Sequence, residues 1–182
     1  MTTYAVFGGS FNPPHVAHQM ACLYVLETEP VDAVMVVPTF RHPFDKHLCP
    51  YEHRLEMARL AMAPLGPRVV VSDIERGLGG EASLTLHTLE ALAAAHPGIG
   101  LRLVIGSDIL REREKWYRWE DIERLAPPII VARAGFPVDG LAVELPAISS
   151  TEVRARLARG ESGLPLVPRA VSAYIQAHGL YS

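Results

Sequence analysis

The sequence predicts one α/β domain built on a doubly wound parallel sheet. Short apolar runs, too short for helices, alternate along the 182 residues with longer segments of helical periodicity. The runs are continuously apolar rather than alternating, which is typical of strands buried on both faces of a parallel sheet. No internal repeat, low-complexity tract or linker divides the chain. We therefore expect helices on both faces of a single sheet.

The predicted strands are each followed by a glycine, a proline or a polar residue, which ends the apolar run. Such short runs bounded by chain-breaking residues favour strands over buried helices. The strands are expected at residues 4–7, 33–37, 69–71, 101–105, 129–132 and 141–145.

The predicted helices lie between these strands and after the last one. Pro50 is suited to the start of the second helix, since its missing N–H would be unpaired there in any case. Ser83 is expected to cap the third helix. The first helix is expected to have an apolar side formed by Met20, Leu23, Tyr24 and Leu26. The five helices are predicted at residues 15–27, 50–63, 83–96, 150–159 and 168–178.

Composition excludes several classes of function. With 17 basic and 20 acidic residues, the chain has a net charge of −3, so no basic excess favours a nucleic acid partner. Cys22 and Cys49 form no CxxC motif and indicate neither a disulfide framework nor a zinc site. No signal peptide or membrane span is recognised. We expect a cytoplasmic protein, and the sequence predicts no particular oligomeric state.

The loop after the first predicted strand, GGSFNPPHVAH, indicates a phosphate site. Gly8 and Gly9 allow close approach of the backbone to a ligand. His15 and His18 share the first turn of the following helix, where unpaired N–H groups favour anions. Two surface histidines or half of a metal site are the alternatives. No carboxylate or cysteine stands at ligand spacing, so no metal site is predicted, and neither GxxxxGK[ST] nor GxGxxG is present.

A second unusual loop, GSDILREREKWYRW, follows the strand predicted at 101–105. Gly106 allows a flat ring to lie against the strand end, and Asp108 can accept hydrogen bonds from ribose hydroxyls. Trp116, Tyr117 and Trp119 follow within the same segment. Packing is the ordinary role of such a cluster, and stacking of one ring on a ligand is the alternative.

The third loop, ISSTEVR, opens a helix near the C-terminus. Ser149 and Glu152 have the spacing of a capping box, which alone could explain the serine. Ser150, Thr151 and Arg154 share the first turn and bring hydroxyl groups, free amides and a guanidinium together. Ligands bind beyond the carboxyl ends of the strands in doubly wound sheets. Two such helix starts, each after a strand, therefore predict a site for a polyphosphate.

Taken together, these motifs resemble those of the nucleotidyltransferases with a T/HxGH-type motif, specifically bacterial nicotinate/nicotinamide mononucleotide adenylyltransferases. The resemblance runs the length of the chain and also includes YEHRLEM and VARAG. It implies a Rossmann-like nucleotidyltransferase fold, a single domain over residues 1–182, with the helical part from about residue 149 completing the ATP site. It also implies transfer of AMP from ATP to nicotinate mononucleotide (NaMN), and possible use of the amide NMN, with release of pyrophosphate in NAD biosynthesis.

The resemblance implies roles for individual residues as well. His18 would be the more important histidine at the transferring phosphorus, and Mg²⁺ would arrive with ATP. The catalytic residues would be His15, His18, Lys46 and Arg154. The residues that bind ATP would be Gly8, Gly9, Ser10, Gly106, Asp108, Ser150 and Thr151. The residues that bind the pyridine nucleotide would be Thr85, Trp116, which would stack on the ring, and Tyr117.

Some residues depart from the family pattern and bear on the acceptor. Ala17 replaces a glycine, Leu84 replaces an aromatic residue, and His87 stands where aspartate is frequent. The loop RHPFDKHL differs from the common form around its lysine, and its histidines, like His53, are expected to be solvated rather than metal ligands. The glycine-rich loop 77–80 is expected to close over substrate.

Several other functions are compatible with parts of the pattern. A related adenylyltransferase could use phosphopantetheine or a phospho-alcohol as acceptor. An aminoacyl-tRNA synthetase shares an HxGH-like motif, but the chain lacks the length for a tRNA-binding domain and has ISSTEVR in place of a KMSKS-like loop. A nucleotide-binding protein without turnover is a third alternative, which the presence of both histidines, Lys46 and Arg154 disfavours.

Overall fold

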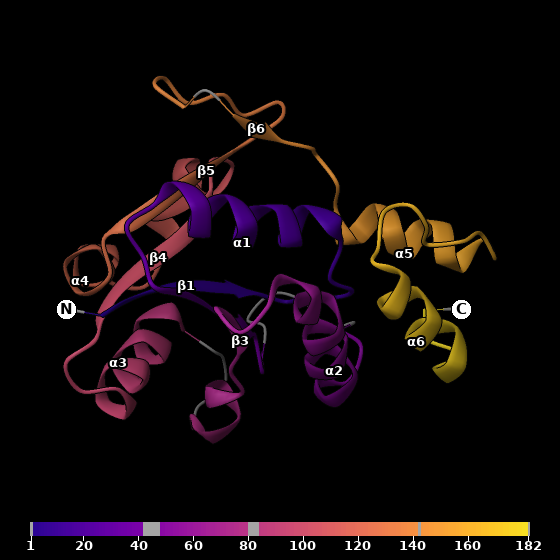
Figure 1. Cartoon of the computed structure of the whole chain (residues 1–182), viewed down its shortest axis with the longest axis horizontal. Helices are drawn as coiled ribbons and strands as arrows, with labels where there is room; N and C mark the ends of the chain where they lie inside the picture. Colours follow the sequence, from indigo (N-terminus) through magenta and orange to yellow (C-terminus); the bar gives the residue numbers. More distant parts are fainter. Residues whose placement is uncertain (1, 42–47, 80–83, 142, 182) are drawn as a thin grey trace.

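The structure, a computed structural model, describes residues 2–41, 48–79, 84–141 and 143–181. Within these ranges six strands pair in parallel in the order β3-β2-β1-β4-β5-β6 (Figure 1). This confirms the predicted doubly wound sheet. The strands are β1 (Thr3–Gly9), β2 (Ala33–Pro38), β3 (Val69–Val71), β4 (Gly100–Gly106), β5 (Pro128–Arg133) and β6 (Glu144–Leu145).

Helices cover both faces of this sheet. In Figure 1, α1 and α3 lie on opposite faces of the sheet. Helices α5 and α6 lie together at one end of the molecule, where α6 contacts α2. The α-helices are α1 (Val16–Thr28), α2 (Tyr51–Met62), α3 (Thr85–Ala95), α4 (Trp119–Leu125), α5 (Ser150–Ala158) and α6 (Arg169–His178). Three 3-10 helices connect other elements, and they are η1 (Ala63–Leu65), η2 (Ile74–Gly77) and η3 (Ile109–Lys115).

Two hydrophobic cores form because neighbouring residues of each strand point to opposite faces. Ala5 of β1 and Val34 of β2 join the core that includes residues of α1, α2 and α6. Val6 and Met35, the next residue in each strand, join the core that includes residues of α3 and α4. Burial on both faces explains why these strands are apolar at every position.

The order of the strands places two loops together. The chain runs from β1 outward to β3, then returns to β4 on the other side of β1. The loops that follow β1 and β4 therefore diverge at the point where the strand order reverses, where doubly wound sheets form their ligand crevice. No helix in the described part of the chain is long and apolar enough to cross a bilayer.

The orientation of α1 differs from the prediction. Met20 and Leu23 are 43% and 51% exposed, although both were expected on the apolar side. Ala17 and Ala21, one turn apart, are buried instead. Leu26 is buried as expected, and Tyr24 is partly buried against the core. The buried residues of α1 are Ala17, Ala21, Cys22, Val25 and Leu26.

Three other elements differ in their bounds. Strand β6 pairs over Glu144–Leu145, so the strand predicted at 141–145 is wrong in its first part. Helix α4 was not predicted, because seven residues are too few to show a clear helical period. Leu84 is the N-cap of α3, and Ser83, the predicted cap, lies outside the described residues.

Candidate functional site

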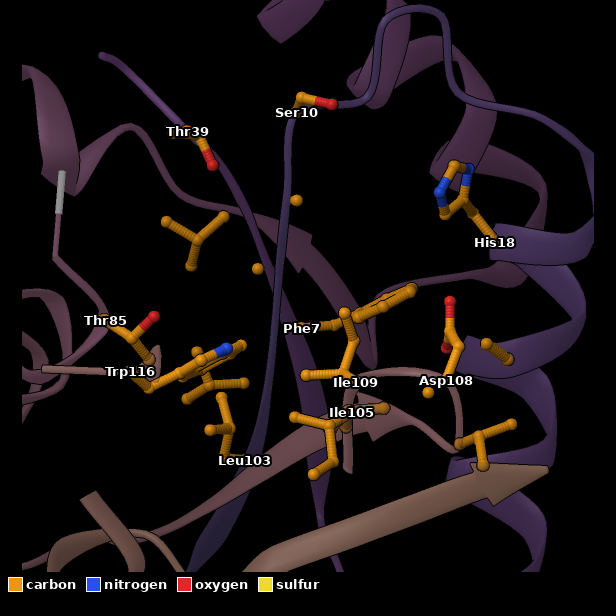
Figure 2. A pocket seen from close by; sticks show the side chains of 18 of the residues that line it. Phe7, Ser10, His18, Thr39, Thr85, Leu103, Ile105, Asp108, Ile109 and Trp116 are labelled. Atoms are coloured by element: carbon orange, nitrogen blue, oxygen red, sulfur yellow. The ribbon is translucent and has the colours of Figure 1, made fainter. Parts of the chain in front are cut away.

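A cavity of about 580 Å³ lies at the ends of β1 and β4 and is lined by residues from both cores. Figure 2 shows His18 and Asp108 at one end of it and Thr85 and Trp116 at the other. We call these the phosphate end and the acceptor end. The predicted site residues that line the cavity are Gly8, Gly9, Ser10, His15, His18, Thr85, Gly106, Asp108, Trp116 and Tyr117.

The histidine pair forms the start of α1. His15 is the N-cap, and its backbone N–H donates to Nδ1 of His18 at 3.0 Å. The two rings stack with centroids 3.6 Å apart, and the Phe11 ring packs edge-on against His18 at 4.9 Å. Since Nδ1 of His18 accepts a hydrogen bond, a neutral His18 carries its proton on Nε2. The loop and helix thus fix His18 as a directed donor.

Burial makes both histidines poor proton acceptors. Burial and, as a smaller cause, the nearby Arg133 guanidinium together lower the pKa of His15 to about 4. Burial also lowers the pKa of His18 well below its usual value, with His15 and Arg133 as additional causes. Both imidazoles are therefore neutral at pH 7. A neutral imidazole can donate its one N–H to a phosphate oxygen, but it lacks the second, acidic proton of an imidazolium and so is a poor general acid.

Arg133, at the end of β5, forms an ion pair at the phosphate end of the cavity. Its Nη1 donates to Oδ2 of Asp108 at 2.6 Å, and its Nη2 donates to the carbonyl oxygen of Ile148 at 3.2 Å. Oδ1 of Asp108 is buried and has no hydrogen-bond partner among the described residues. This oxygen lies against Gly106, and the expected hydrogen bond from a ribose hydroxyl to Asp108 stays a prediction.

Gly106 is required by the Asp108 carboxylate that follows it. A Cβ at residue 106 would lie 2.3 Å from Oδ1 of Asp108 and 3.2 Å from Cδ of Arg133. The first distance is shorter than real Cβ contacts allow, so the Asp108 carboxylate would have to move, and the second is tight enough that the Arg133 side chain would have to shift slightly. The glycine expected to admit a ligand ring also makes room for the aspartate.

The sequence analysis did not assign a role to Arg133, although VARAG was recognised as a motif. One signal could have identified it. Arg133 ends β5, which pairs with β4, and Asp108 follows the end of β4. Oppositely charged residues at the carboxyl ends of adjacent parallel strands are brought together by the sheet. The adjacency of the two strands was the missing information.

The start of α5 contacts the loop after β1 rather than the cavity itself. Oγ of Ser149 accepts from the backbone N–H of Glu152 at 3.1 Å, which confirms the predicted serine cap. Oγ of Ser150 donates to the carbonyl oxygen of Pro13 at 2.9 Å. Nη1 of Arg154 donates to the carbonyl oxygen of Asn12 at 2.8 Å. The two predicted phosphate-binding loops, far apart in sequence, are therefore joined directly.

Thr151 and Arg154 also contact each other, through a hydrogen bond of 3.3 Å between Nη2 and Oγ1. Neither of them, nor Ser150, is among the described residues that line the cavity. Lys46, His42 and His47 lie outside the described residues. Gly77 ends η2, while Gly80 of the predicted closing loop also lies outside the described residues.

The acceptor end is formed by aromatic and polar side chains. Trp116 lines the cavity and packs edge-on against Trp119, with ring centroids 5.7 Å apart. Tyr117 is 50% exposed and contacts the ring of His87. Thr85 is the first residue of α3. Trp116 thus has the expected packing contact and also lies at the cavity wall, while stacking of its ring on a ligand stays a prediction.

Glu75 is a buried residue of the cavity wall that the sequence analysis did not single out. Its side chain accepts from Oγ1 of Thr88 at 2.7 Å and from the backbone N–H of Phe40 at 2.8 Å. It therefore joins α3 to the segment after β2. Nothing in its spacing distinguishes it from a solvated glutamate, so only the fold reveals this role.

In the described part of the chain, no group of three or more His, Cys, Asp or Glu side chains is arranged to hold a metal ion. His53 of α2 lies against α6, with Nδ1 at 2.9 Å from the hydroxyl oxygen of Tyr174. This histidine is part of a contact between two helices and lies apart from the cavity lining.

Comparison with known proteins gives a consistent result. A family model described as Cytidylyltransferase-like matches residues 6–156. A probable nicotinate-nucleotide adenylyltransferase of Anaeromyxobacter sp. (strain K) is 52% identical over 178 residues, covering 97% of this chain and 95% of that protein. One from Myxococcus xanthus (strain DK1622) is 44% identical over 180 residues, covering 97% and 93%. The structure of Plasmodium falciparum nicotinic acid mononucleotide adenylyltransferase complexed with NaAD shares the fold, with a TM-score of 0.82 at 20% identity over 100% of this chain and 98% of that one.

Proposed function

The chain belongs to the cytidylyltransferase-like family, and we propose that it is a nicotinate-nucleotide adenylyltransferase. It transfers AMP from ATP to NaMN, releases pyrophosphate and forms the dinucleotide precursor of NAD. The relatives at 52% and 44% identity, which bear this activity in their names, support the proposal. The observation that carries it is one cavity with a neutral histidine donor at one end and Thr85 and Trp116 at the other.

The reaction needs alignment and charge stabilisation more than acid or base chemistry. An oxygen of the 5′-phosphate of NaMN attacks the α-phosphorus of ATP, and the bond to the pyrophosphate oxygen breaks. This nucleophile is already anionic, so no general base is required. The protein must hold two polyanions in line and stabilise the charge that grows on the phosphates. A cavity with fixed donors suits this task.

At the phosphate end, Nε2–H of His18 donates to an oxygen of the α-phosphate as charge develops there, and His15 contacts the neighbouring phosphates. The backbone of Gly8, Gly9 and Ser10 lies along the nucleotide. The Asp108 carboxylate accepts from the ribose beside Gly106, with Arg133 holding it in place. Lys46 neutralises charge on the phosphates.

The start of α5 serves the tail of ATP. Ser150 and Thr151 offer the free N–H groups of a helix N-terminus, which favours an anion. Arg154 neutralises the triphosphate and also fixes the loop through its bond to Asn12. The C-terminal part of the domain, from about residue 149, thus completes the ATP site.

At the acceptor end, Trp116 stacks on the pyridine ring, while Thr85 and the backbone around Tyr117 bind its carboxyl group. Mg²⁺ enters as part of MgATP, held by phosphate oxygens and water. We place the enzyme in the cytoplasm, where ATP is available, with ATP and NaMN as its partners rather than nucleic acid or membrane.

The test is pyrophosphate release from MgATP with NaMN, NMN or phosphopantetheine supplied separately. Release with NaMN, at a higher kcat/KM than with NMN, is the expected result. A higher kcat/KM with NMN would make the protein an amide-preferring enzyme. Release with phosphopantetheine alone would keep adenylyl transfer and overturn the acceptor. Binding of ATP and NaMN with no release from any acceptor would show a nucleotide-binding protein without turnover.

A further inference from the structure

Asn12 is the most tightly held residue of the loop that carries the histidines. It is fully buried between the glycines that end β1 and the His15 cap. Its side-chain Oδ1 accepts from the backbone N–H of Cys49 at 3.1 Å and from the hydroxyl of Tyr181 at 2.8 Å. Its backbone carbonyl accepts from Arg154. Three segments distant in sequence therefore meet at this one residue.

The hydroxyl that donates to Asn12 belongs to Tyr181, which follows helix α6. Helix α6 ends at Gly179, which has a left-handed backbone conformation, and the N–H of Leu180 bonds back to the carbonyl oxygen of Ile175 at 3.1 Å. Tyr181 follows, also left-handed at φ 66°. Such a conformation is unfavourable for a residue with a Cβ and persists where other contacts hold it.

Two contacts hold Tyr181 in this position. Its ring packs against the core beneath α1, α2 and α6, and its hydroxyl bonds to Asn12. Burial raises the pKa of Tyr181, so the hydroxyl keeps its proton and remains a donor. The Cys49 side chain lies beside it, and that neighbour also raises the pKa of the tyrosine.

We infer that Tyr181 is a positioning residue for adenylyl transfer, acting through Asn12 on the loop that places His15 and His18. The inference rests on the proposed function. Nothing on the acceptor end of the cavity is bonded to Asn12 in the contacts described, so the effect should be confined to the phosphate end. Removing the hydroxyl takes away one of the two hydrogen bonds that Oδ1 of Asn12 accepts, and the loop can then shift. A displacement of this kind lowers kcat steeply because the reacting atoms must align.

The test compares Tyr181→Phe with Tyr174→Phe. Both variants remove one hydroxyl from the C-terminal segment, but the Tyr174 hydroxyl contacts His53 between α2 and α6. We expect Tyr181→Phe to lower kcat about tenfold and to raise the KM for ATP, with the KM for NaMN unchanged, as follows from lost alignment. Tyr174→Phe should leave all three constants within twofold of wild type.

A purely structural role would give a different pattern. If Tyr181 only stabilised the fold, Tyr181→Phe would lower the Tm and leave kcat at 15 °C unchanged, and that result would overturn the inference. So would equal effects on the KM values of ATP and NaMN. Circular dichroism of both variants checks that the fold is retained.

A binding measurement separates this inference from the proposed function. α,β-Methylene-ATP is titrated into wild type and both variants by calorimetry. If wild type binds the analogue but releases no pyrophosphate with NaMN, the proposed function fails. The positioning of the loop is then judged from affinity alone, which should weaken at least threefold in Tyr181→Phe and not in Tyr174→Phe. Equal affinities would reject it.

Discussion

The two ends of the cavity are held by different kinds of contact. At the phosphate end, side chains from α2, α5 and the C-terminal turn bond to the loop after β1, through Arg54 on Ser10, Arg154 and Tyr181 on Asn12, and Ser150 on Pro13. At the acceptor end, rings meet edge to edge, as between Trp116 and Trp119 and between Tyr117 and His87.

This difference indicates how proteins of one fold can keep the same transfer reaction while the substrate that accepts the transferred group varies. Hydrogen bonds to carbonyl oxygens fix the position of a backbone in direction and distance. Ring packing is less directional, and a half-exposed ring such as Tyr117 can be replaced without disturbing a core. The departures at Leu84 and His87 fall on the acceptor end, whereas the departure at Ala17 lies between the two histidines. The end that we propose aligns the phosphates carries the hydrogen-bond network.

The largest expected effect is at His18. His18→Ala removes a donor aimed at the developing charge and should lower kcat a hundredfold or more, on the order of 2.7–4 kcal/mol of barrier. Affinity for NaMN should change little, because the acceptor end is untouched. Steady-state pyrophosphate release at saturating substrates measures it. Near-normal turnover would remove His18 from the mechanism, and His53→Ala is the matched control outside the cavity lining.

A second test adds a methyl group at the phosphate end. Gly106→Ala places a Cβ against Asp108 and Arg133, so the ion pair must move. We expect a loss of about 1–3 kcal/mol in the free energy of unfolding, the usual result of overpacking, and a raised KM for ATP. Gly77→Ala, where a Cβ would meet nothing within 4 Å, is the control for the stability measurement. Urea denaturation and initial rates give both quantities, and identical behaviour of the two variants would contradict this account.

A third test moves to the acceptor end. Trp116→Ala should raise the KM for NaMN roughly tenfold, within the 1–3 kcal/mol typical of stacking between an aromatic side chain and a base. The KM for ATP should stay the same. Trp116→Phe keeps a ring and should recover most of the loss. If the KM for ATP rose as much as that for NaMN, the division of the cavity into two independent ends would be wrong.

The last prediction concerns the pH dependence of stability. The pKa values of His15 and His18 are lower in the folded protein than in the unfolded chain. Below about pH 6.5 the unfolded chain therefore binds more protons than the folded protein. The free energy of unfolding is not reduced by these two histidines above that pH, and it decreases as the pH falls below it. The slope is about 1.4 kcal/mol per pH unit for each histidine.

His18→Ala should accordingly flatten the loss of stability between pH 6.5 and 5, as followed by urea denaturation at each pH. His87→Gln, a change to an exposed histidine at the acceptor end, should keep the wild-type slope. Carboxylate contributions are common to all three proteins and cancel in the comparison. Parallel curves for wild type and His18→Ala would show that His18 is not held neutral by the fold.

The fold was predictable because strands buried on both faces leave a plain sequence signal. The phosphate end was predictable in part, since GGSFNPPHVAH and ISSTEVR are local motifs that can be recognised within a few residues. Arg133, Glu75 and Tyr181 could not be found this way. Their partners are distant in sequence, and each looks like an ordinary surface residue until the sheet order is known. The face of α1 was predicted only in part: Leu26 is buried as expected, but Ala17 and Ala21 rather than Met20 and Leu23 face the core.

The bonds that tie α5 to the loop after β1 set an order of events during synthesis. Ser150 and Arg154 lie 137 and 142 residues after the carbonyl groups they bind. The ribosome makes the loop and both histidines first, and the groups that fix them follow only after the strands β1 to β6 have been synthesised. A growing chain thus carries the histidine pair long before the backbone around it is fastened.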